Sequence, residues 1–209
     1  MEMSKQDHLP AIILASGLSR RMGSDKTQML LGGRPLIAHI LERLRMQADP
    51  VWINAPSDYP LDLGIPNYAD PLPDRPGPLA GVLAGLMALE RHDEQYSHIL
   101  TVPGDTPFLP HDLVERLRAV ATTGTIILAA SGGRTHPVIA LWPKNLASDL
   151  AVWLDDPHHR RVFDFVDRHP RVIVDFLMVD TDLGSQDPFF NINTPEDLKQ
   201  AEALLQKGI

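Results

Sequence analysis

The residues best suited to chemistry lie in the first thirty positions, where an apolar run is followed by a loop of small and cationic residues. The run, residues 11–15, predicts a short strand buried on both faces. Gly17 and Gly23 allow the loop backbone to approach a ligand closely. The cations of the loop are Arg20, Arg21 and Lys26. A buried strand that leads into a basic, glycine-bearing loop is the usual way in which an α/β protein binds phosphate.

The spacing of this loop excludes the two commonest phosphate-binding loops. The dinucleotide fingerprint G-x-G-x-x-G needs a glycine two positions after Gly17, where the chain has Ser19. The Walker loop needs four residues between its glycines and a lysine directly after the second. Here five residues separate Gly17 from Gly23, and two more precede Lys26.

Asp105 is the strongest single candidate for a catalytic carboxylate. It follows the apolar run at residues 99–102 within the segment GDTPFLP. Mg²⁺ prefers one or two carboxylates together with substrate phosphates and water, which fits a lone Asp at this position. An Asp that caps a turn after a strand is equally common. The spacing leaves both interpretations open.

The elements that must position these residues alternate between strand and helix. Strands are expected at residues 11–15, 51–53, 65–69, 99–102, 126–130, 137–142 and 172–179. Helices are expected at about residues 35–44, 79–91, 111–120, 146–155, 161–168 and 195–207. Thr194, Pro195 and Asp197 form a capping-box pattern at the start of the last helix. The alternation predicts an α/β fold with a mostly parallel sheet covered by helices on both faces.

Polar residues follow several of the expected strands. Ser16, Asn54, Asp70 and Asp105 all stand at such ends. Ligands in open α/β sheets lie beyond the carboxyl ends of the strands, so these side chains are candidates for one site. Asn54 and Asp70 are also common turn residues, and from the residues alone a turn is the favoured interpretation of Asn54.

Length and composition predict a single domain. The chain has 209 residues, and we expect one domain over residues 1–209, with residues 1–9 as a flexible arm. A net charge of −8 argues against general nucleic-acid binding. The chain contains no cysteine, no signal-peptide pattern and no apolar run of membrane-spanning length. We expect a cytoplasmic monomer without a membrane partner.

Several motifs resemble those of the molybdopterin nucleotidyltransferase family, and they occur in the family's order. They are LASGLSRRMGSDK (14–26), GGRPL (32–36), PGPLAG (76–81), GDTP (104–107), RTHPVIAL (134–141), RRVFDF (160–165) and NINTPEDL (191–198). The resemblance covers nearly the whole chain, and PGPLAG, RTHPVIAL and RRVFDF are typical of the guanylyltransferase branch. The chain departs from the pattern at Ser16, where that branch has glycine and the cytidylyltransferase branch has alanine.

The resemblance implies a three-layer, Rossmann-like fold and transfer of GMP from GTP to molybdenum-molybdopterin, with Mg²⁺ as the cofactor. It implies catalytic roles for Arg21, Lys26 and Asp105, with Asp105 as the metal ligand. The implied nucleotide-binding residues are Leu14, Ala15, Ser16, Gly17, Lys26, Asn54, Asp70, Pro78, Leu79 and Asp105. The implied molybdopterin-binding residues are Arg134, Arg160, Arg161, Asn191 and Asn193. The implied protein partners are other cofactor-biosynthesis proteins or the enzymes that receive the cofactor.

Three alternatives to GMP transfer stay open. Ser16 leaves room for CMP transfer to molybdopterin or for nucleotide transfer to a sugar phosphate. A protein of a different class, which binds molybdopterin and nucleotide without turnover, is the third alternative. The combination of Arg21, Lys26 and Asp105 favours an enzyme over such a carrier.

Overall fold

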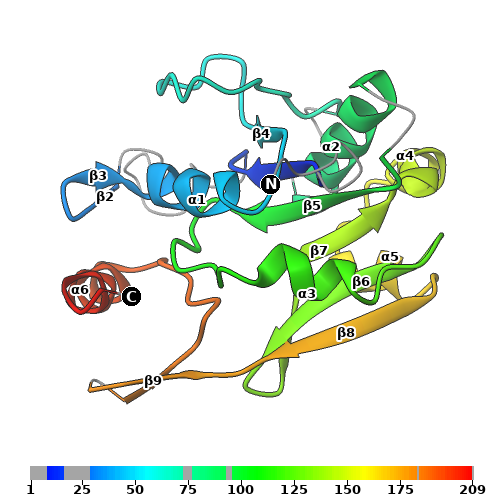
Figure 1. Ribbon diagram of the computed structural model, residues 1–209. Helices are drawn as coiled ribbons and strands as arrows, with labels where there is room; N and C mark the ends of the chain where they lie inside the picture. Colours follow the sequence, from blue (N-terminus) through cyan, green and yellow to red (C-terminus); the bar gives the residue numbers. More distant parts are fainter. Residues whose placement is uncertain (1–8, 17–28, 73–76, 93–95, 183, 209) are drawn as a thin grey trace, which may run out of the picture.

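A six-stranded sheet forms the middle layer of the fold (Figure 1). The computed structural model describes residues 9–16, 29–72, 77–92, 96–182 and 184–208. Within these, the strands of the main sheet lie in the order β4 (Val51–Asn54), β1 (Ala11–Leu14), β5 (His98–Pro103), β7 (Arg134–Pro143), β6 (Ile126–Ser131) and β8 (Arg171–Phe176).

The sheet is mixed, and most of its strands are parallel. β1 pairs in parallel with both β4 and β5, and β6 pairs in parallel with β8. β7 pairs antiparallel with β5 on one side and with β6 on the other. The carboxyl ends of β1, β4, β5 and β6 therefore lie at the same edge of the sheet, and the prediction of a mostly parallel sheet is confirmed.

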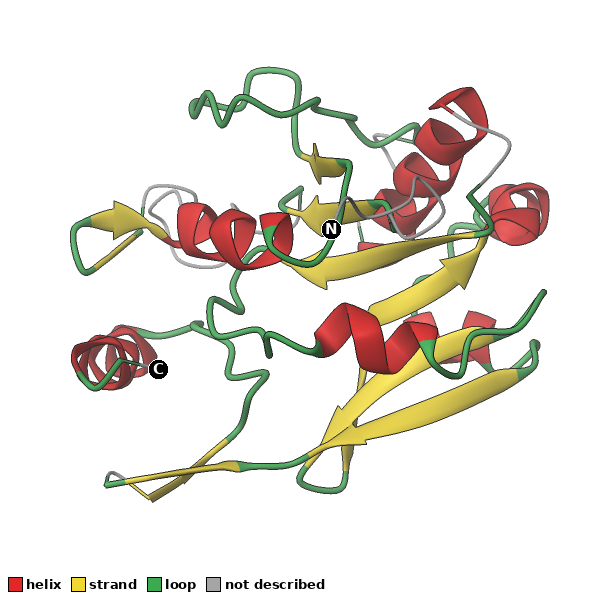
Figure 2. Ribbon diagram, in the orientation of Figure 1, coloured by secondary structure: helices red, strands yellow, loops and turns green. Residues whose placement is uncertain are grey.

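Helices cover both faces of the sheet, as predicted (Figure 2). One face carries α1 (Leu36–Arg45) and α3 (Leu113–Arg118), and the opposite face carries α2 (Pro78–His92), α4 (Ala147–Trp153) and α5 (Val162–Val166). The side chains of β1 show why its sequence is apolar throughout. Ala11 and Ile13 pack into the α1 layer, while Ile12 and Leu14 pack into the α2 layer. A strand buried on both faces has no polar positions.

Two glycines bring α2 unusually close to β1. A Cβ atom at Gly81 would lie 2.5 Å from Asn54 Oδ1 and 2.9 Å from Leu14 Cδ2. A Cβ at Gly85 would lie 2.9 Å from Ile12 Cγ2. These distances are shorter than real Cβ contacts, so only glycine fits at these positions without displacement. The beginning of α2 is thereby held against the ends of β1 and β4.

The last helix packs outside the main sheet. α6 (Pro195–Gln206) begins at the predicted capping box, in which the Thr194 side chain accepts from the Asp197 amide and the Asp197 carboxylate accepts from the Thr194 amide. It packs beside the two-stranded sheet of β2 (Leu30–Leu31) and β3 (Arg34–Pro35). Their shared core consists of Leu31, Leu36, Phe108, Ile192, Ala201 and Leu204.

The expectation of a strand at residues 65–69 is wrong. This segment forms a single bridge, Ile53 with Asn67. The Ile53 amide donates to Pro66 O at 3.0 Å, and the Tyr68 amide donates to Ile53 O at 2.8 Å. Pro66 has no amide hydrogen of its own, which limits the ladder it can form with β4.

The expected strand at residues 172–179 is also corrected, because it divides into two strands. β8 ends at Phe176, opposite Ser131, since its partner β6 ends there. The chain resumes as β9 (Val179–Thr181), which pairs with β10 (Gly184–Gln186) in a separate hairpin.

The helices expected at residues 146–155 and 161–168 exist but are shorter than predicted. A 3₁₀ turn, Lys144–Leu146, precedes α4, and extended backbone at Arg161 (φ −83°, ψ 128°) precedes α5. In the described part of the chain, no helix combines the length and apolar character needed to cross a bilayer.

Candidate nucleotide-transfer site

Backbone hydrogen bonds join the carboxyl ends of β1, β4 and β5 into one edge. The Ala15 amide donates to Asn54 O at 2.8 Å, and the Gly104 amide donates to Leu14 O at 3.0 Å. Leu14, Ala15 and Asn54 are buried there, and Ser16 is half-buried. The structure thus brings together the predicted residues at the ends of these three strands. Ligands of open α/β sheets bind outside such an edge.

Asn54 holds the position of Asp70. Its Nδ2 donates to Asp70 Oδ1 at 2.9 Å and to Tyr68 O at 2.8 Å. The side-chain amide has two hydrogens, and each has a partner here, so none is left for a ligand. Its Oδ1 faces Gly81 at the beginning of α2. The favoured interpretation of Asn54 as a local turn residue is therefore corrected, because its partners lie 14 and 16 residues away.

Asp105 lies two residues beyond β5 at the same edge, as predicted. It is half-buried, and its carbonyl oxygen accepts from the Ile192 amide at 2.9 Å. Next to it, Thr106 Oγ1 donates to Asn191 Oδ1 at 2.8 Å, and Thr106 is fully buried. The structure therefore brings Asn191 beside the Asp105 loop, although 85 residues separate Thr106 from Asn191.

The donor set at this edge fits a metal ion that takes few protein ligands. Among the described residues, no group of three or more His, Cys, Asp or Glu side chains could hold a metal by itself. Mg²⁺ is commonly bound by one or two carboxylates plus substrate phosphates and water. A half-buried carboxylate at Asp105, at the edge where phosphate is expected, suits that chemistry.

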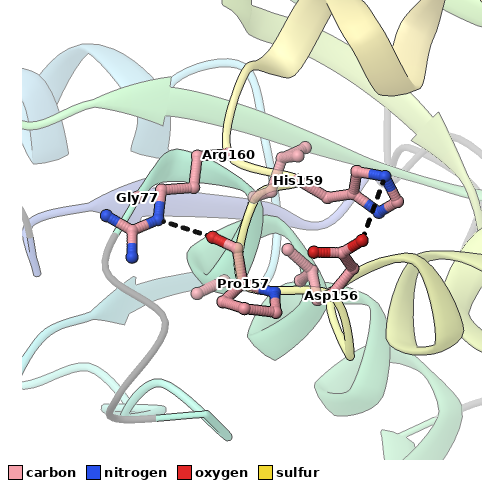
Figure 3. A pocket seen from close by; sticks show the side chains of 8 residues that line it. Gly77, Asp156, Pro157, His159 and Arg160 are labelled. Atoms are coloured by element: carbon pink, nitrogen blue, oxygen red, sulfur yellow. Dashed lines mark hydrogen bonds and ion pairs between the residues drawn. The ribbon is translucent and has the colours of Figure 1, made fainter.

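A pocket lies beside the beginning of α2 (Figure 3). It is lined by Gly77, Leu79, Ala80, Leu154, Asp156, Pro157, His159 and Arg160. Arg160 Nε donates to Pro157 O at 2.9 Å, which fixes the guanidinium within this loop. The His159 ring stacks on Trp153, with ring centroids 3.6 Å apart. Arg160, predicted to contact molybdopterin, thus lies near Leu79, predicted to contact the nucleotide.

The remaining predicted molybdopterin residues are spread over different elements. Arg134 is exposed at the start of β7, and Arg161 is exposed at the residue that precedes α5. The Asn193 amide donates to Asp197 Oδ2 at 2.8 Å, so its backbone serves the cap of α6. Of the predicted residues in the phosphate loop, Gly17, Arg21 and Lys26 lie outside the described residues, as do Arg20 and Gly23.

A buried polar network that the sequence did not reveal lies at the carboxyl end of β6. Ser131 Oγ donates to Asp187 Oδ1 at 2.6 Å and lies 2.7 Å from His136 Nε2. Burial lowers the pKa of His136, and Arg134 acts in the same direction, while the Asp187 carboxylate opposes the shift. The only sequence signal was the position of His136 in the motif RTHPVIAL, for which no role was predicted.

Comparison with known proteins identifies the family. Residues 11–172 match the family described as "MobA-like NTP transferase domain". The chain belongs to this nucleotidyltransferase family. A protein of Rhizobium meliloti named "Molybdenum cofactor guanylyltransferase" is 46% identical over 199 residues, which cover 94% of this chain and 91% of that protein. A Sinorhizobium fredii protein of the same name is 44% identical, with 98% and 95% covered.

Solved structures of this fold support the family's architecture here. The molybdopterin-guanine dinucleotide biosynthesis protein A of Archaeoglobus fulgidus superposes with a TM-score of 0.74 at 22% identity, covering 95% of this chain and all of that one. Rv0371c from Mycobacterium tuberculosis, in its complex with manganese, superposes with a TM-score of 0.64 at 16% identity, covering 94% and 98%. These likenesses confirm the predicted Rossmann-like nucleotidyltransferase fold.

Proposed function

We propose that this chain is a molybdenum cofactor guanylyltransferase, which transfers GMP from GTP to molybdenum-molybdopterin. A terminal phosphate oxygen of molybdopterin attacks the α-phosphorus of GTP, and a new P–O–P bond forms. The bond between the α-phosphorus and the bridging oxygen breaks, and its electron pair leaves with pyrophosphate. The product is molybdopterin guanine dinucleotide.

The observation that carries this proposal is the near full-length similarity to proteins named for the same reaction, at 42–46% identity. The geometry agrees with it. Asn54 and Asp70 are joined at one end of the edge formed by β1, β4 and β5, and Asp105 stands at the end of β5. This is where an α/β protein of this class binds its nucleotide.

The residues of this chain act mainly by positioning the two substrates and by offsetting charge. Asp70, held by Asn54, and the beginning of α2 at Pro78 and Leu79 form the nucleoside side of the site. Arg21 and Lys26, in the loop that follows Ser16, offset the charge of the triphosphate. Catalysis then rests on alignment and electrostatic stabilisation, as in phosphoryl transfer generally, and it needs no covalent intermediate.

Asp105 would hold the divalent metal, for which we propose Mg²⁺. When bound, such an ion neutralises phosphate charge and orients phosphate oxygens. The manganese complex of Rv0371c supports a divalent metal in this fold, and does not favour one ion over another.

The acceptor side of the proposed site comprises Asn191, beside the Asp105 loop, and Arg134, Arg160, Arg161 and Asn193. We further propose that the chain acts as a single cytoplasmic domain and a monomer. It would exchange the cofactor with other biosynthesis proteins or with recipient enzymes.

The test is nucleotide incorporation by the purified chain. Molybdenum-molybdopterin is incubated with Mg²⁺ and either GTP or CTP, and pyrophosphate and dinucleotide are measured. We expect guanine dinucleotide with GTP and little product with CTP. A preference for CTP would overturn the assignment of guanine as the transferred base. Ser16 would then be the first residue to examine as the cause. Absence of pyrophosphate release with both nucleotides would favour a binding protein without turnover.

A further inference from the structure

The network of the buried Ser131 and His136 with the half-buried Asp187 joins the main sheet to the segment that reaches Asp105. Ser131 ends β6 and His136 lies on β7, whereas Asp187 follows the hairpin of β9 and β10. Ser131 is 1% exposed and His136 is 9% exposed, so the polar contacts between them are shielded from water. Buried polar groups that are fully paired favour one conformation, because a lost partner is costly to replace there.

The positions of the protons follow from the donors available. An ionised Asp187 carboxylate can only accept, so the single hydroxyl hydrogen of Ser131 goes to Asp187 Oδ1. The contact between Ser131 Oγ and His136 Nε2 then requires that Nε2 carries a hydrogen and donates it. Ser131 thus connects an imidazole donor on β7 with the Asp187 carboxylate acceptor.

The network is not arranged for hydrolysis, although it contains the residue types of a catalytic triad. In a triad the histidine stands between the other two residues and contacts them through different ring nitrogens. Here the serine hydroxyl donates directly to the carboxylate, and the same nitrogen, His136 Nε2, faces both Ser131 and Asp187 Oδ2, the latter at 3.9 Å. The buried Ser131 also has no exposed face for a substrate.

Asp187 also fixes the position of the residues that follow it. Its Oδ1 also accepts from the Phe189 amide at 2.8 Å, and its carbonyl accepts from the Phe190 amide at 3.1 Å. The Phe189 ring packs on the His136 ring, with centroids 4.9 Å apart. The next two residues, Asn191 and Ile192, make the contacts with Thr106 and Asp105 described above.

We propose that Ser131, His136 and Asp187 are positioning residues that hold segment 187–192 against the Asp105 loop. This rests on the proposed function for its catalytic consequence, since Asp105 is the proposed metal ligand. Ser131 and Asp187 act through the segment and touch no substrate. Their loss therefore alters the alignment of Asp105 and Asn191, and leaves the nucleoside side of the site at Asn54 and Asp70 in place.

The test compares Ser131→Ala with the wild-type chain by amide hydrogen exchange and by steady-state kinetics. We expect faster exchange in residues 189–192 of the folded variant, with protection in β1 and β5 unchanged. We expect kcat to fall by about tenfold and KM for GTP to change little, because misalignment acts on the transferring groups rather than on nucleoside binding. Asp187→Ala should reproduce this result, and the double variant should be no worse than either single one.

Two further variants distinguish the loss of the Asp187 hydrogen bonds from the loss of its charge and from the effect of an unrelated surface substitution. Asp187→Asn keeps an acceptor oxygen for Ser131 and Phe189, so exchange in residues 189–192 should stay near the wild-type rate. Asp182→Ala removes an exposed carboxylate whose partner is Lys207 Nζ, at 3.3 Å, and should change neither readout. If the Asp187→Ala chain fails to fold, the exchange and kinetics of Ser131→Ala alone test the proposal.

Wild-type exchange in residues 189–192 of folded Ser131→Ala would overturn the proposal, and so would an equal acceleration across the whole chain. The exchange measurement needs no substrate. It therefore stays decisive even if the wild-type chain transfers neither GMP nor CMP, a result that would count against the proposed function alone.

Discussion

The position of the Asp70 carboxylate depends on Asn54, which is itself buried. Asn54 is 1% exposed, and its side-chain amide joins Asp70 to the backbone of Tyr68. Leaving the buried Asn54 amide without its partner would cost about 1–3 kcal/mol, so this contact determines where the Asp70 carboxylate lies. In the proposed nucleotide site, Asn54 thus acts through Asp70.

Replacing Asn54 with Ala should weaken GTP binding through Asp70. We expect KM for GTP to rise about tenfold with a smaller change in kcat, since about 1.4 kcal/mol of uniform binding is lost. A double-mutant cycle with Asp70→Ala measures the dependence. The two single effects should not add, because both remove the same oriented carboxylate. Additive effects would show that Asn54 acts independently of Asp70.

Asp105→Asn should abolish most of the transfer activity while the fold is kept. The substitution preserves size but removes the charge that would hold the metal, and we expect kcat to fall by roughly 10²–10³-fold. Circular dichroism and thermal unfolding check the fold, and turnover is measured over a range of Mg²⁺ concentrations. Near-normal turnover of the folded variant at high Mg²⁺ would rule out Asp105 as the metal ligand.

Single residues also show how far the sequence could predict the site. Asp105 and Asn54 were found because each follows an apolar run, which is a local signal. Asp70 was also a candidate, but its hydrogen bond with Asn54, 16 residues away, left no mark in the pattern. The pairing of Ser131 with Asp187, 56 residues away, gave no local signal either. Only the folded sheet edge brings such residues together.

Among the elements, α2 lies so close to the sheet that two of its positions fit only glycine without displacement. Its glycines let the helix approach β1 and β4, and each faces a different part of the sheet. Gly81 faces the side chains of Asn54 and Leu14 at the site, whereas Gly85 faces Ile12 and Ile99 in the core. The same change at the two positions therefore separates an effect on the site from an effect on packing.

Gly81→Ala should raise KM for GTP, and Gly85→Ala should not. Each added methyl group overpacks the interface, at a cost of about 1–3 kcal/mol. The better helix propensity of alanine offsets up to about 1 kcal/mol of this. We expect comparable decreases in the free energy of unfolding, measured with guanidinium chloride. If both variants keep the wild-type KM for GTP, the beginning of α2 does not contribute to nucleotide binding.

The sequence predicted the buried elements well because their periodicity reflects burial. It failed where the end of an element depends on its partner. β8 ends where β6 ends, and the segment at residues 65–69 forms only one bridge with β4. Neither outcome is encoded in the local pattern of apolar residues.

For the molecule as a whole, two buried histidines link stability to pH. Burial is the largest cause of the lowered pKa of both His98 and His136. Hydrogen bonds with the backbone of Thr125 and Thr122 oppose the shift at His98. The unfolded chain therefore binds protons at a higher pH, near the ordinary value of about 6.5, than the folded chain does. Stability is fully present above that pH and declines as the pH falls below it.

The unfolding free energy should accordingly be lower at pH 5.5 than at pH 7.5, at constant ionic strength. Guanidinium unfolding at both values measures the difference. His98→Asn should reduce this difference in unfolding free energy, because one group with a lowered pKa is removed. His98 lies at the amino end of β5, away from the proposed site. His158→Asn, the same substitution at an exposed position, is the matched control for the loss of an imidazole. An undiminished pH dependence in His98→Asn would exclude His98 as a contributor.

The contact between Ile192 and Asp105 also has a consequence for the order of events during protein synthesis. β1, β4 and β5 are complete long before the ribosome reaches residue 192, and the last strand of the main sheet ends at Phe176. A nascent chain can therefore assemble its six strands while the Asp105 loop still lacks its C-terminal partner. A chain shortened after Phe176 would therefore keep the residues of all six strands but lose the Ile192 amide that donates to the Asp105 carbonyl.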